Sequence, residues 1–278
     1  MFNGAIKTNG NRSVSRPKTF LLLASLIACF VAHLAAPLPA IAEEPVHVLA
    51  TGVFATALQS LAPAFEASSG SQIRVSIANA GEVAARVAAG EAADVVMTSS
   101  TGVKALAKQG ALALDEIVIG RMRLGVAVSS GAAMQNLRSS LASTETFRAL
   151  LLSADKVAYI DPNGGGTSGP FFEKMFVSLG MADAVHAKAV LCKTGADIVK
   201  AVASGRATIG MTQASEIVGA DGVAFAGYLP EAQNLTTVYS AAIATGSKQA
   251  KAASAFLAFV AGPSGSDRLR RAGWDVAP

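Results

Sequence analysis

The feature that most constrains the fold is a repeated alternation of short apolar runs with amphipathic helical patterns. The apolar run 46–49 is followed by apolar residues between Phe54 and Phe65 at helical spacing, and Gly70 ends that pattern. The same order recurs along the chain: 73–77 with 82–89, 94–97 with 101–108, 156–160 with 171–179, 187–191 with 198–202, and 208–211 with 213–218. Repeated strand–helix–strand units predict an α/β fold in which mostly parallel sheets are flanked by helices.

The alternation is interrupted in the middle and changes near the end. Residues 123–128 are predicted to form a strand, and the serine-rich stretch 129–144 predicts a loop that leads into a helix at 147–152. Near the end, residues 235–244 are predicted to be extended, and two helices are expected within 250–272. No repeat of solenoid length accompanies these elements.

The first 42 residues have the layout of a secretory signal peptide. They carry four basic and no acidic side chains, an apolar run from Phe20 to Val31, and the small-residue sequence Ala40-Ile41-Ala42. Cleavage after Ala42 would place the mature protein in the periplasm. An alternative is lipoprotein processing at Cys29, but that would leave an apolar tether where a polar one is expected, so simple cleavage is favoured.

Removal of this leader changes what the charge of the chain implies. The leader holds four of the 23 Lys and Arg residues, so the mature chain balances its 19 Asp and Glu with an equal number of bases. A neutral chain without a basic patch gives no support for nucleic-acid binding. The mature chain keeps one cysteine, Cys192, and two histidines far apart in sequence, His47 and His186, so we expect no disulfide, no metal site and no cofactor.

A glycine-rich stretch, Asp161-Pro162-Asn163-Gly164-Gly165-Gly166-Thr167-Ser168, lies between the strand candidate 156–160 and the helical pattern that starts at Phe171. Glycines let a ligand approach the backbone, and free N–H groups at a helix start suit an anionic oxygen. The stretch lacks the lysine of a nucleotide P-loop and the spacing of a dinucleotide fingerprint. Anion binding and a plain turn both remain open on this stretch alone.

In parallel sheets, ligands bind beyond the carboxyl ends of the strands, where the loops deliver helix N-termini. The loops predicted at that edge are rich in small and hydroxyl-bearing residues. The candidate ligand-binding residues are Thr51, Gly52, Val53, Asn79, Ala80, Gly81, Thr98, Ser99, Gly165, Gly166, Thr167, Ser168, Gly195, Thr212 and Gln213. Each of them taken singly could equally be a helix cap, so the hypothesis depends on their recurrence in both halves of the chain.

Four segments follow one another in an order shared with a known family: Val48-Leu49-Ala50-Thr51-Gly52, Leu61-Ala62-Pro63-Ala64-Phe65-Glu66, Ala89-Gly90-Glu91-Ala92-Ala93-Asp94-Val95-Val96-Met97-Thr98, and Ser204-Gly205-Arg206-Ala207-Thr208-Ile209-Gly210. In these segments the chain resembles the periplasmic molybdate-binding proteins of ABC importers, and the likeness extends over essentially the whole mature chain. The resemblance implies a type II periplasmic-binding fold, with two α/β lobes joined by crossing strands near 121–126 and 239–242. The first lobe would be 43–122, completed by 241–278, and the second lobe 123–240.

The resemblance also implies a function. Proteins of this kind are monomers that capture a small anion and hand it to an ABC permease in the inner membrane. The oxyanion contacts of the family are only partly matched, because the serine after the first strand is Val53 here, with Thr51 as the nearest hydroxyl. The serine-rich turn of the family is Asn79-Ala80-Gly81, and its tyrosine after the Gly-Met strand is Gln213. We therefore expect an anion other than molybdate, such as an organic carboxylate, or an oxyanion held by rearranged contacts; backbone donors leave molybdate itself open.

An enzyme on the same fold is the alternative hypothesis. Some relatives on this fold are similar to a periplasmic isomerase that moves the double bond of aconitate, which is a proton transfer that needs a base, an acid and a place for an anion. Glu82 is the carboxylate expected at a cleft-facing helix start, and it is the candidate base in this hypothesis. Its plain role there is to complement the helix dipole and to pair with Arg86. A non-catalytic capture protein is the main hypothesis and an aconitate-type isomerase the alternative.

Overall fold

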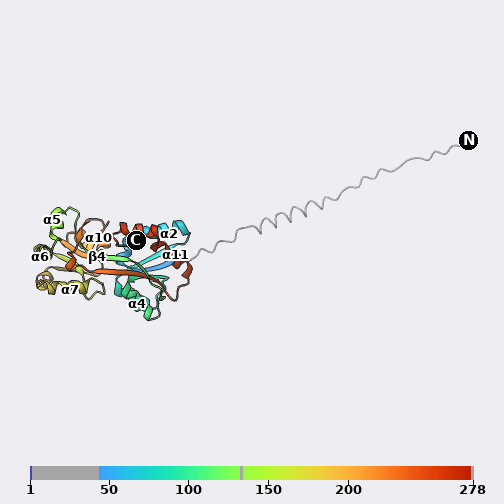
Figure 1. The fold of residues 1–278 in the computed structure, drawn as a ribbon, viewed down its shortest axis with the longest axis horizontal. Helices are drawn as coiled ribbons and strands as arrows, with labels where there is room; N and C mark the ends of the chain where they lie inside the picture. The colour runs from blue at the N-terminus through green and yellow to red at the C-terminus, as the bar shows by residue number, and fades with distance from the viewer. Residues whose placement is uncertain (2–43, 132–133, 277–278) are drawn as a thin grey trace. The chain divides into compact units, whose positions relative to one another are not determined.

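The computed structural model describes residues 1, 44–131 and 134–276, so all but Met1 of the predicted signal peptide at 1–42 lies outside the described residues. The described strands form one nine-stranded sheet with helices on both of its faces (Figure 1). The strands are β1 (Val46–Thr51), β2 (Ile73–Ala78), β3 (Val95–Ser99), β4 (Ile117–Ser129), β5 (Val157–Ile160), β6 (Ala189–Cys192), β7 (Ile209–Gln213), β8 (Val223–Tyr228) and β9 (Thr236–Ile243).

The helices lie between these strands in the sequence, except α11 and α12, which follow β9. They are η1 (Gly52–Phe54), α2 (Ala55–Ser69), α3 (Ala80–Ala88), α4 (Ser100–Lys108), α5 (Met134–Ser140), α6 (Thr144–Ser153), α7 (Gly169–Ser178), α8 (Ala182–His186), α9 (Gly195–Ala203), α10 (Ala214–Ile217), η2 (Glu231–Gln233), α11 (Ala250–Ala261) and α12 (Pro263–Arg271). None of the helices that the structure describes is long and apolar enough to cross a membrane.

The sheet consists of two parts that share β4. Its strand order is β2-β1-β3-β9-β4-β7-β5-β6, with β8 paired to β4 outside this path. In one part, β2, β1 and β3 are parallel, and β9 joins β3 to the first half of β4 by antiparallel pairing. In the other part, β7, β5 and β6 are parallel, and the second half of β4 pairs antiparallel with β7 and β8. We call these the first and the second sheet segment.

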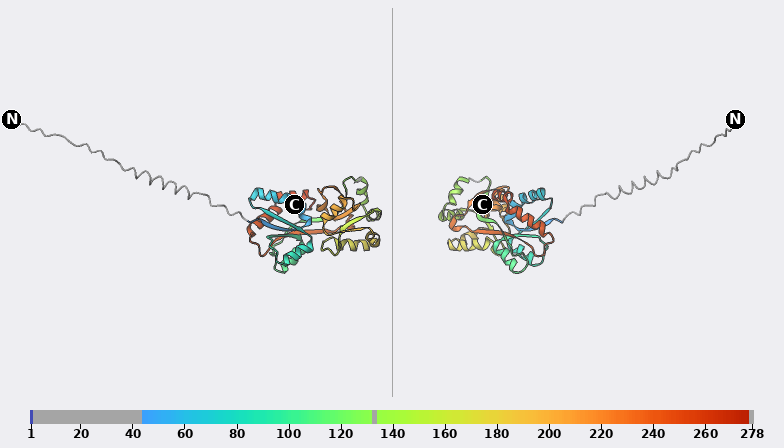
Figure 2. Two further views of the ribbon diagram at one scale, coloured as in Figure 1. Left: turned by 180° about the vertical axis from the view of Figure 1, so that it is seen from behind. Right: turned by 45° about the vertical axis from the view of Figure 1, so that its right-hand side comes forward.

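The change of partners on β4 occurs between Arg123, which pairs with β9, and Leu124, which pairs with β7. The side chain of Asn234 fixes this point. Its Oδ1 accepts the N–H of Leu124 at 2.9 Å, and its Nδ2 donates to the carbonyl of Leu124 at 3.1 Å and to that of Leu229 at 2.9 Å. Figure 2 shows the long strands running between the two segments.

Three expectations from the sequence need correction. The stretch 129–144 is not all loop, because it contains α5, where Leu137 packs against the core of the second segment. The strand predicted at 123–128 is the second half of β4, which begins at Ile117. Strand β8 was missed; its sequence is interrupted by Gly227, whose φ of 150° and neighbouring shift in register mark an irregular edge pairing.

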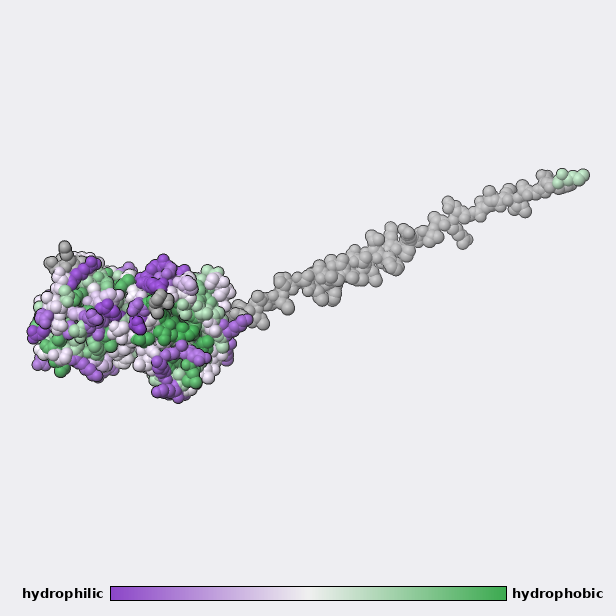
Figure 3. Space-filling view, in the orientation of Figure 1, coloured by the Kyte–Doolittle hydropathy of each residue, from purple (hydrophilic) through white to green (hydrophobic). Residues whose placement is uncertain are grey.

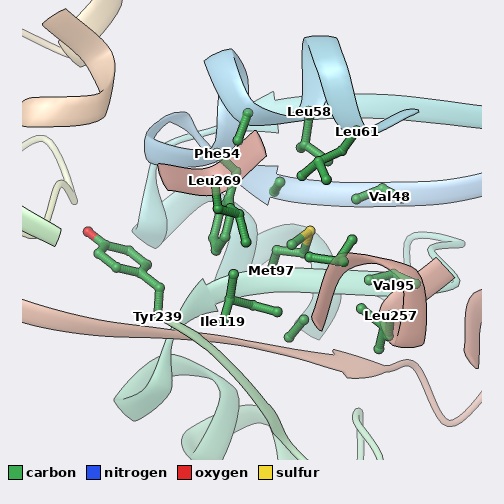
Figure 4. Packing of buried hydrophobic residues seen from close by; sticks show 14 of the residues in the cluster. Val48, Phe54, Leu58, Leu61, Val95, Met97, Ile119, Tyr239, Leu257 and Leu269 are labelled. Atoms are coloured by element: carbon green, nitrogen blue, oxygen red, sulfur yellow. The ribbon is translucent and has the colours of Figure 1, made fainter. Parts of the chain in front are cut away.

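Each sheet segment has its own hydrophobic core. In the first, side chains from β1, α2, β3, β9 and α11 pack around Phe54, which stacks on Trp274 with ring centroids 4.7 Å apart (Figure 4). In the second, Tyr159 of β5 packs with Phe172 and Phe176 of α7 in an aromatic group. The first core also reaches the second segment, through Ala214 of α10 and through Phe225 and Tyr228 of β8.

The surface is mixed in polarity. Figure 3 shows hydrophobic surface gathered over the strands between α2 and α4, with hydrophilic residues spread over the rest of that face. The edge strand β2 exposes Val75 and Ile77, and Ile77 also borders the cavity described next.

Candidate ligand-binding site

A cavity of about 520 Å³ lies between the two sheet segments. Loops that follow β1 and β2 line it from the first segment, and loops that follow β5, β6 and β7 line it from the second. Five helical elements begin at its wall, namely η1, α3, α7, α9 and α10. Helix starts carry free N–H groups and the positive end of the helix dipole, so this convergence suits an anion.

Most of the residues predicted from the loops line this cavity. They are Thr51, Gly52, Val53, Asn79, Ala80, Gly166, Thr167, Ser168, Gly195, Thr212 and Gln213. They come from both sheet segments, as parallel strands that end at one edge require.

The other four predicted residues do not line the cavity. The N–H of Gly81 donates to the carbonyl of Gly165 at 2.9 Å, so these two join the loop after β2 to the loop after β5. Thr98 is buried, and Ser99 caps α4, because its Oγ accepts the N–H of Gly102 at 3.2 Å. Ser99 therefore serves as the N-cap of α4.

Two polar side chains of the lining are buried without a partner. Thr51 and Gln213 are each 5% exposed, and the Thr51 hydroxyl and both amide atoms of Gln213 lack a hydrogen-bond partner among the described residues. Buried polar atoms are nearly always bonded, so these three atoms, on residues of the cavity wall, are candidates for a partner that the described residues do not supply. Asn79 and Thr194 differ from them, because their side chains already accept backbone N–H groups as caps of α3 and α9.

A carboxylate that the sequence did not mark, Glu216 on α10, lies in the same lining. The hydroxyl of Thr212 donates to its Oε2 at 2.5 Å. The carboxylate lies against two glycines: a Cβ atom on Gly52 would be 2.6 Å from Oε1, and one on Gly195 would be 2.5 Å from Oε1 and nearer still to Oε2. Burial raises the pKa of this carboxyl, and hydrogen bonds from Thr212 and from the backbone of Gln213 only partly oppose the rise.

Tyr239 on β9 brings a phenol to the cavity. Figure 4 shows its hydroxyl directed away from the first core, at whose margin its ring packs. Burial, and then the charge of Glu216, raise the pKa of the phenol, so Tyr239 stays neutral at physiological pH and can donate a hydrogen bond.

Charged groups of both signs stand at the cavity besides Glu216. Lys193 and Lys200, both exposed, line it from the start of α9 and from its next turns, and Asp221 lines it from the loop after α10. In the part of the chain that the structure describes, no group of three His, Cys, Asp or Glu is placed to hold a metal ion.

Glu82 is exposed and does not belong to the cavity lining. Its backbone N–H donates to Asn79 Oδ1 at 2.9 Å, as expected for the first turn of α3. The ion pair expected between Glu82 and Arg86 does not form, because the guanidinium of Arg86 pairs with the carboxylate of Glu91 at 2.5 Å. The position of Glu82 therefore supports the helix-dipole role and gives no geometry for a base acting inside the cavity.

The described geometry can be compared with known proteins. The sequence profile of the family described as bacterial extracellular solute-binding protein matches residues 46–275. The chain belongs to this family. Membership implies an extracytoplasmic location for this solute-binding protein.

Similar structures and sequences agree with that assignment. The solute-binding protein superposes on the periplasmic molybdate-binding protein of Azotobacter vinelandii with a TM-score of 0.71, at 20% identity, over 84% of its own chain and 100% of the other. For the sulfate-binding protein SubI of Mycobacterium tuberculosis the TM-score is 0.67, at 17% identity, over 85% and 88%. These likenesses show the type II periplasmic-binding fold. An aconitate isomerase from Pseudomonas sp. is 27% identical over 257 residues, which cover 89% of this chain and 95% of that enzyme.

Several charged or hydroxyl-bearing residues of the lining were not predicted from the sequence, among them Glu216, Tyr239 and Lys193. Glu216 lies in a helix of four residues, and only the approach of glycines from two distant loops shows where its carboxylate lies. Tyr239 was assigned to a crossing strand rather than to the ligand. Lys193 directly precedes the predicted residues around Gly195, so a wider search of that loop would have found it.

Proposed function

We propose that this solute-binding protein captures a small organic polycarboxylate outside the cytoplasm and delivers it to an ABC permease in the inner membrane. The observation that carries the proposal is the cavity, where five helix starts meet around the unpartnered polar groups of Thr51 and Gln213. Backbone N–H groups and neutral side chains can hold carboxylate oxygens from several sides at once.

The size and lining of the cavity favour an organic anion over a tetrahedral oxyanion. About 520 Å³ lies within the roughly 300–1,000 Å³ typical of small-molecule pockets. A water molecule takes about 30 Å³ of liquid, so five heavy atoms would leave much of this space unfilled. Apolar side chains such as Val53, Ile160 and Val199 share the lining with the polar groups, which suits a carbon skeleton between carboxylates.

A thermal-shift comparison tests this proposal. Mature protein is heated with citrate, trans-aconitate, molybdate, tungstate, sulfate or phosphate, each over a concentration series. A ligand at 100 times its Kd adds about 2.7 kcal/mol to the free energy of unfolding, which corresponds to roughly 5–11 °C in Tm for a domain of this size. We expect the shift with a tricarboxylate. A shift with the oxyanions only would refute the preference for an organic anion, and no shift with any of the six would refute anion capture.

A second candidate function is isomerisation of such an anion, and two observations favour it. The similarity to an aconitate isomerase extends over nearly the full length of both chains, and Glu216 and Tyr239 bring a carboxyl and a phenol to one cavity. In aconitate isomerisation a base takes a proton from the methylene carbon, the double bond shifts, and a proton returns to the far carbon of the allylic system. Ionised Glu216 would be the base, and the reaction needs no oxidant or cofactor.

Proton NMR of trans-aconitate in D₂O tests this second candidate. Turnover produces the cis isomer and exchanges methylene protons for deuterium. If Glu216 is the base, Glu216→Gln should lower the rate by about 100-fold or more, and the matched variant Glu82→Gln should retain it. The absence of any cis-aconitate or deuterium exchange in wild-type protein would exclude this candidate.

We propose further that the two sheet segments act as the lobes inferred from the sequence, with 43–122 and 241–278 on one side and 123–240 on the other. The support is that β4 changes partners between Arg123 and Leu124, where Asn234 fixes the backbone. A pivot at this point would let the lobes close over a ligand. The signal peptide at 1–42, its cleavage and a monomeric state belong to the same proposal.

A further inference from the structure

Glu216 is an unusual feature for an anion-binding cavity. Its carboxylate lies against the Cα atoms of Gly52 and Gly195, one from each sheet segment, and Gly195 is the first residue of α9. An anion held by the N–H groups at the start of α9 would therefore be a direct neighbour of this carboxylate.

This carboxylate has neutral hydrogen-bonding partners in the part of the chain that the structure describes. Among the described residues, no Lys, Arg or His forms an ion pair with Glu216, and its identified partners are the hydroxyl of Thr212 and the backbone of Gln213. Both of these partners are neutral donors. The negative charge of an anionic ligand would therefore be repelled by the negative charge of ionised Glu216.

The other titratable groups around α10 do not change this balance. Helix α10 packs against η1, α2, α9, β4, β7 and β8, and η1 and β7 carry no ionisable side chain. The groups on the remaining elements, or on the cavity lining, are Glu66, Asp197, Lys200, Arg121, Arg123, Tyr228, Lys193, Asp221 and Tyr239. Arg123 lies over the ring of Tyr228, 4.4 Å from its centre, and Lys193 and Lys200 are exposed.

Electrostatics then dictates the state of the bound complex. Two unit negative charges about 4 Å apart at a partly buried site repel enough to weaken binding on the order of a thousandfold. A neutral carboxylic acid removes this repulsion and provides an O–H donor, which suits a carboxylate oxygen of the ligand.

We propose that Glu216 is a ligand-binding residue that enters the complex as a neutral carboxylic acid and donates a hydrogen bond to an anionic oxygen of the ligand. The protein would then take up one proton with each ligand wherever free Glu216 is ionised. This inference rests on the proposed capture function, and it differs from the isomerase candidate, in which Glu216 must be ionised when substrate binds.

Calorimetric titration tests the inference. Citrate is titrated into the protein between pH 6 and 9.5, at each pH in two buffers of different ionisation enthalpy, and the difference between the two heats gives the number of protons taken up. Wild-type protein should reach close to one proton per citrate within this range, and the affinity should fall about tenfold per pH unit there. Glu216→Gln keeps the shape and an N–H donor, so its proton uptake should vanish and its affinity should become nearly independent of pH. The matched control Glu82→Gln should follow wild type.

Each remaining outcome decides against a defined claim. Citrate binding without proton uptake at any pH, or equal uptake by wild type and Glu216→Gln, overturns the inference and leaves anion capture standing. Failure of citrate, trans-aconitate and molybdate to bind overturns the capture function and the inference with it. Turnover of trans-aconitate that Glu216→Gln abolishes shows an ionised base and also overturns the inference. Circular dichroism and melting of each variant at pH 5 confirm that a loss of binding is not a loss of folding.

Discussion

The replacement Gly195→Ala tests the position of Glu216 directly. The new methyl group would be placed 2.5 Å from Oε1 of Glu216 and closer to Oε2, so the carboxylate must move. Gly195 is not among the glycines with positive φ, so alanine fits its backbone, and a helix with alanine in place of glycine gains up to about 1 kcal/mol. Movement of the carboxylate breaks its bond with Thr212, which costs about 1.5–3 kcal/mol for a charged partner.

These two terms predict a net loss of about 0.5–3 kcal/mol in the free energy of unfolding. For a domain of this size the loss corresponds to a fall in Tm of roughly 1–12 °C. Citrate should bind more weakly at the same time, because the displaced carboxylate turns into the space that the anion needs. Urea unfolding measures the first effect and calorimetric titration the second.

The same replacement in a variant that lacks the carboxylate should have the opposite effect. In Glu216→Ala there is no carboxylate to displace, so adding Gly195→Ala should raise the free energy of unfolding by up to about 1 kcal/mol. The sign of the effect thus reverses between the two backgrounds. If Gly195→Ala lowers stability equally in both, the contact between Gly195 and Glu216 does not exist as described.

Four further predictions follow from the same structure. The pKa of Glu216 is raised in the folded state, so its contribution to the free energy of unfolding is complete below the ordinary glutamate pKa of about 4.3 and is lost as pH rises to the raised value, at up to about 1.4 kcal/mol per pH unit. Urea unfolding of Glu216→Gln at a series of pH values should lack this fall, and parallel pH profiles of wild type and variant would contradict the prediction. Thr51→Val removes a buried unpartnered hydroxyl, so it should raise the free energy of unfolding by about 1–3 kcal/mol while weakening citrate binding, and a loss of stability would show that the hydroxyl is bonded. Mass spectrometry of exported protein should find an unmodified N-terminus at Glu43, and a lipid on Cys29 would show the alternative processing. Solution scattering should give a smaller radius of gyration with saturating citrate than without it, and an unchanged profile would count against closure of the lobes.

The fold was largely predictable because its periodicity is local. Apolar runs such as 46–49 and 94–97 became buried strands, and the helices between them followed the spacing of their apolar faces. The errors lie where tertiary packing decides. Leu137 holds a serine-rich stretch in a helix against the second core, and β8 depends on pairing with a strand about 100 residues away in the chain.

The candidate site divides in the same way. Residues such as Thr51 and Gly166 could be placed because parallel strands bring their following loops to one edge of the sheet. The carboxylate of the cavity, which belongs to Glu216, could not be placed from the sequence. The preference of acidic residues for helix starts pointed to Glu82 instead. The location of the Glu216 carboxylate depends on the absence of side chains at Gly52 and Gly195, and no local pattern encodes that coincidence.

The hydrogen bond between Gly81 and Gly165 has a consequence for how such proteins diversify. It joins the two sheet segments through main-chain atoms alone, and a Cβ on Gly81 would come within 3.1 Å of Gly165 Cα. Replacing the side chains that face the ligand leaves this bond intact, because neither residue contributes one. Ligand preference can therefore change through these side chains while the main-chain contact between the segments stays the same.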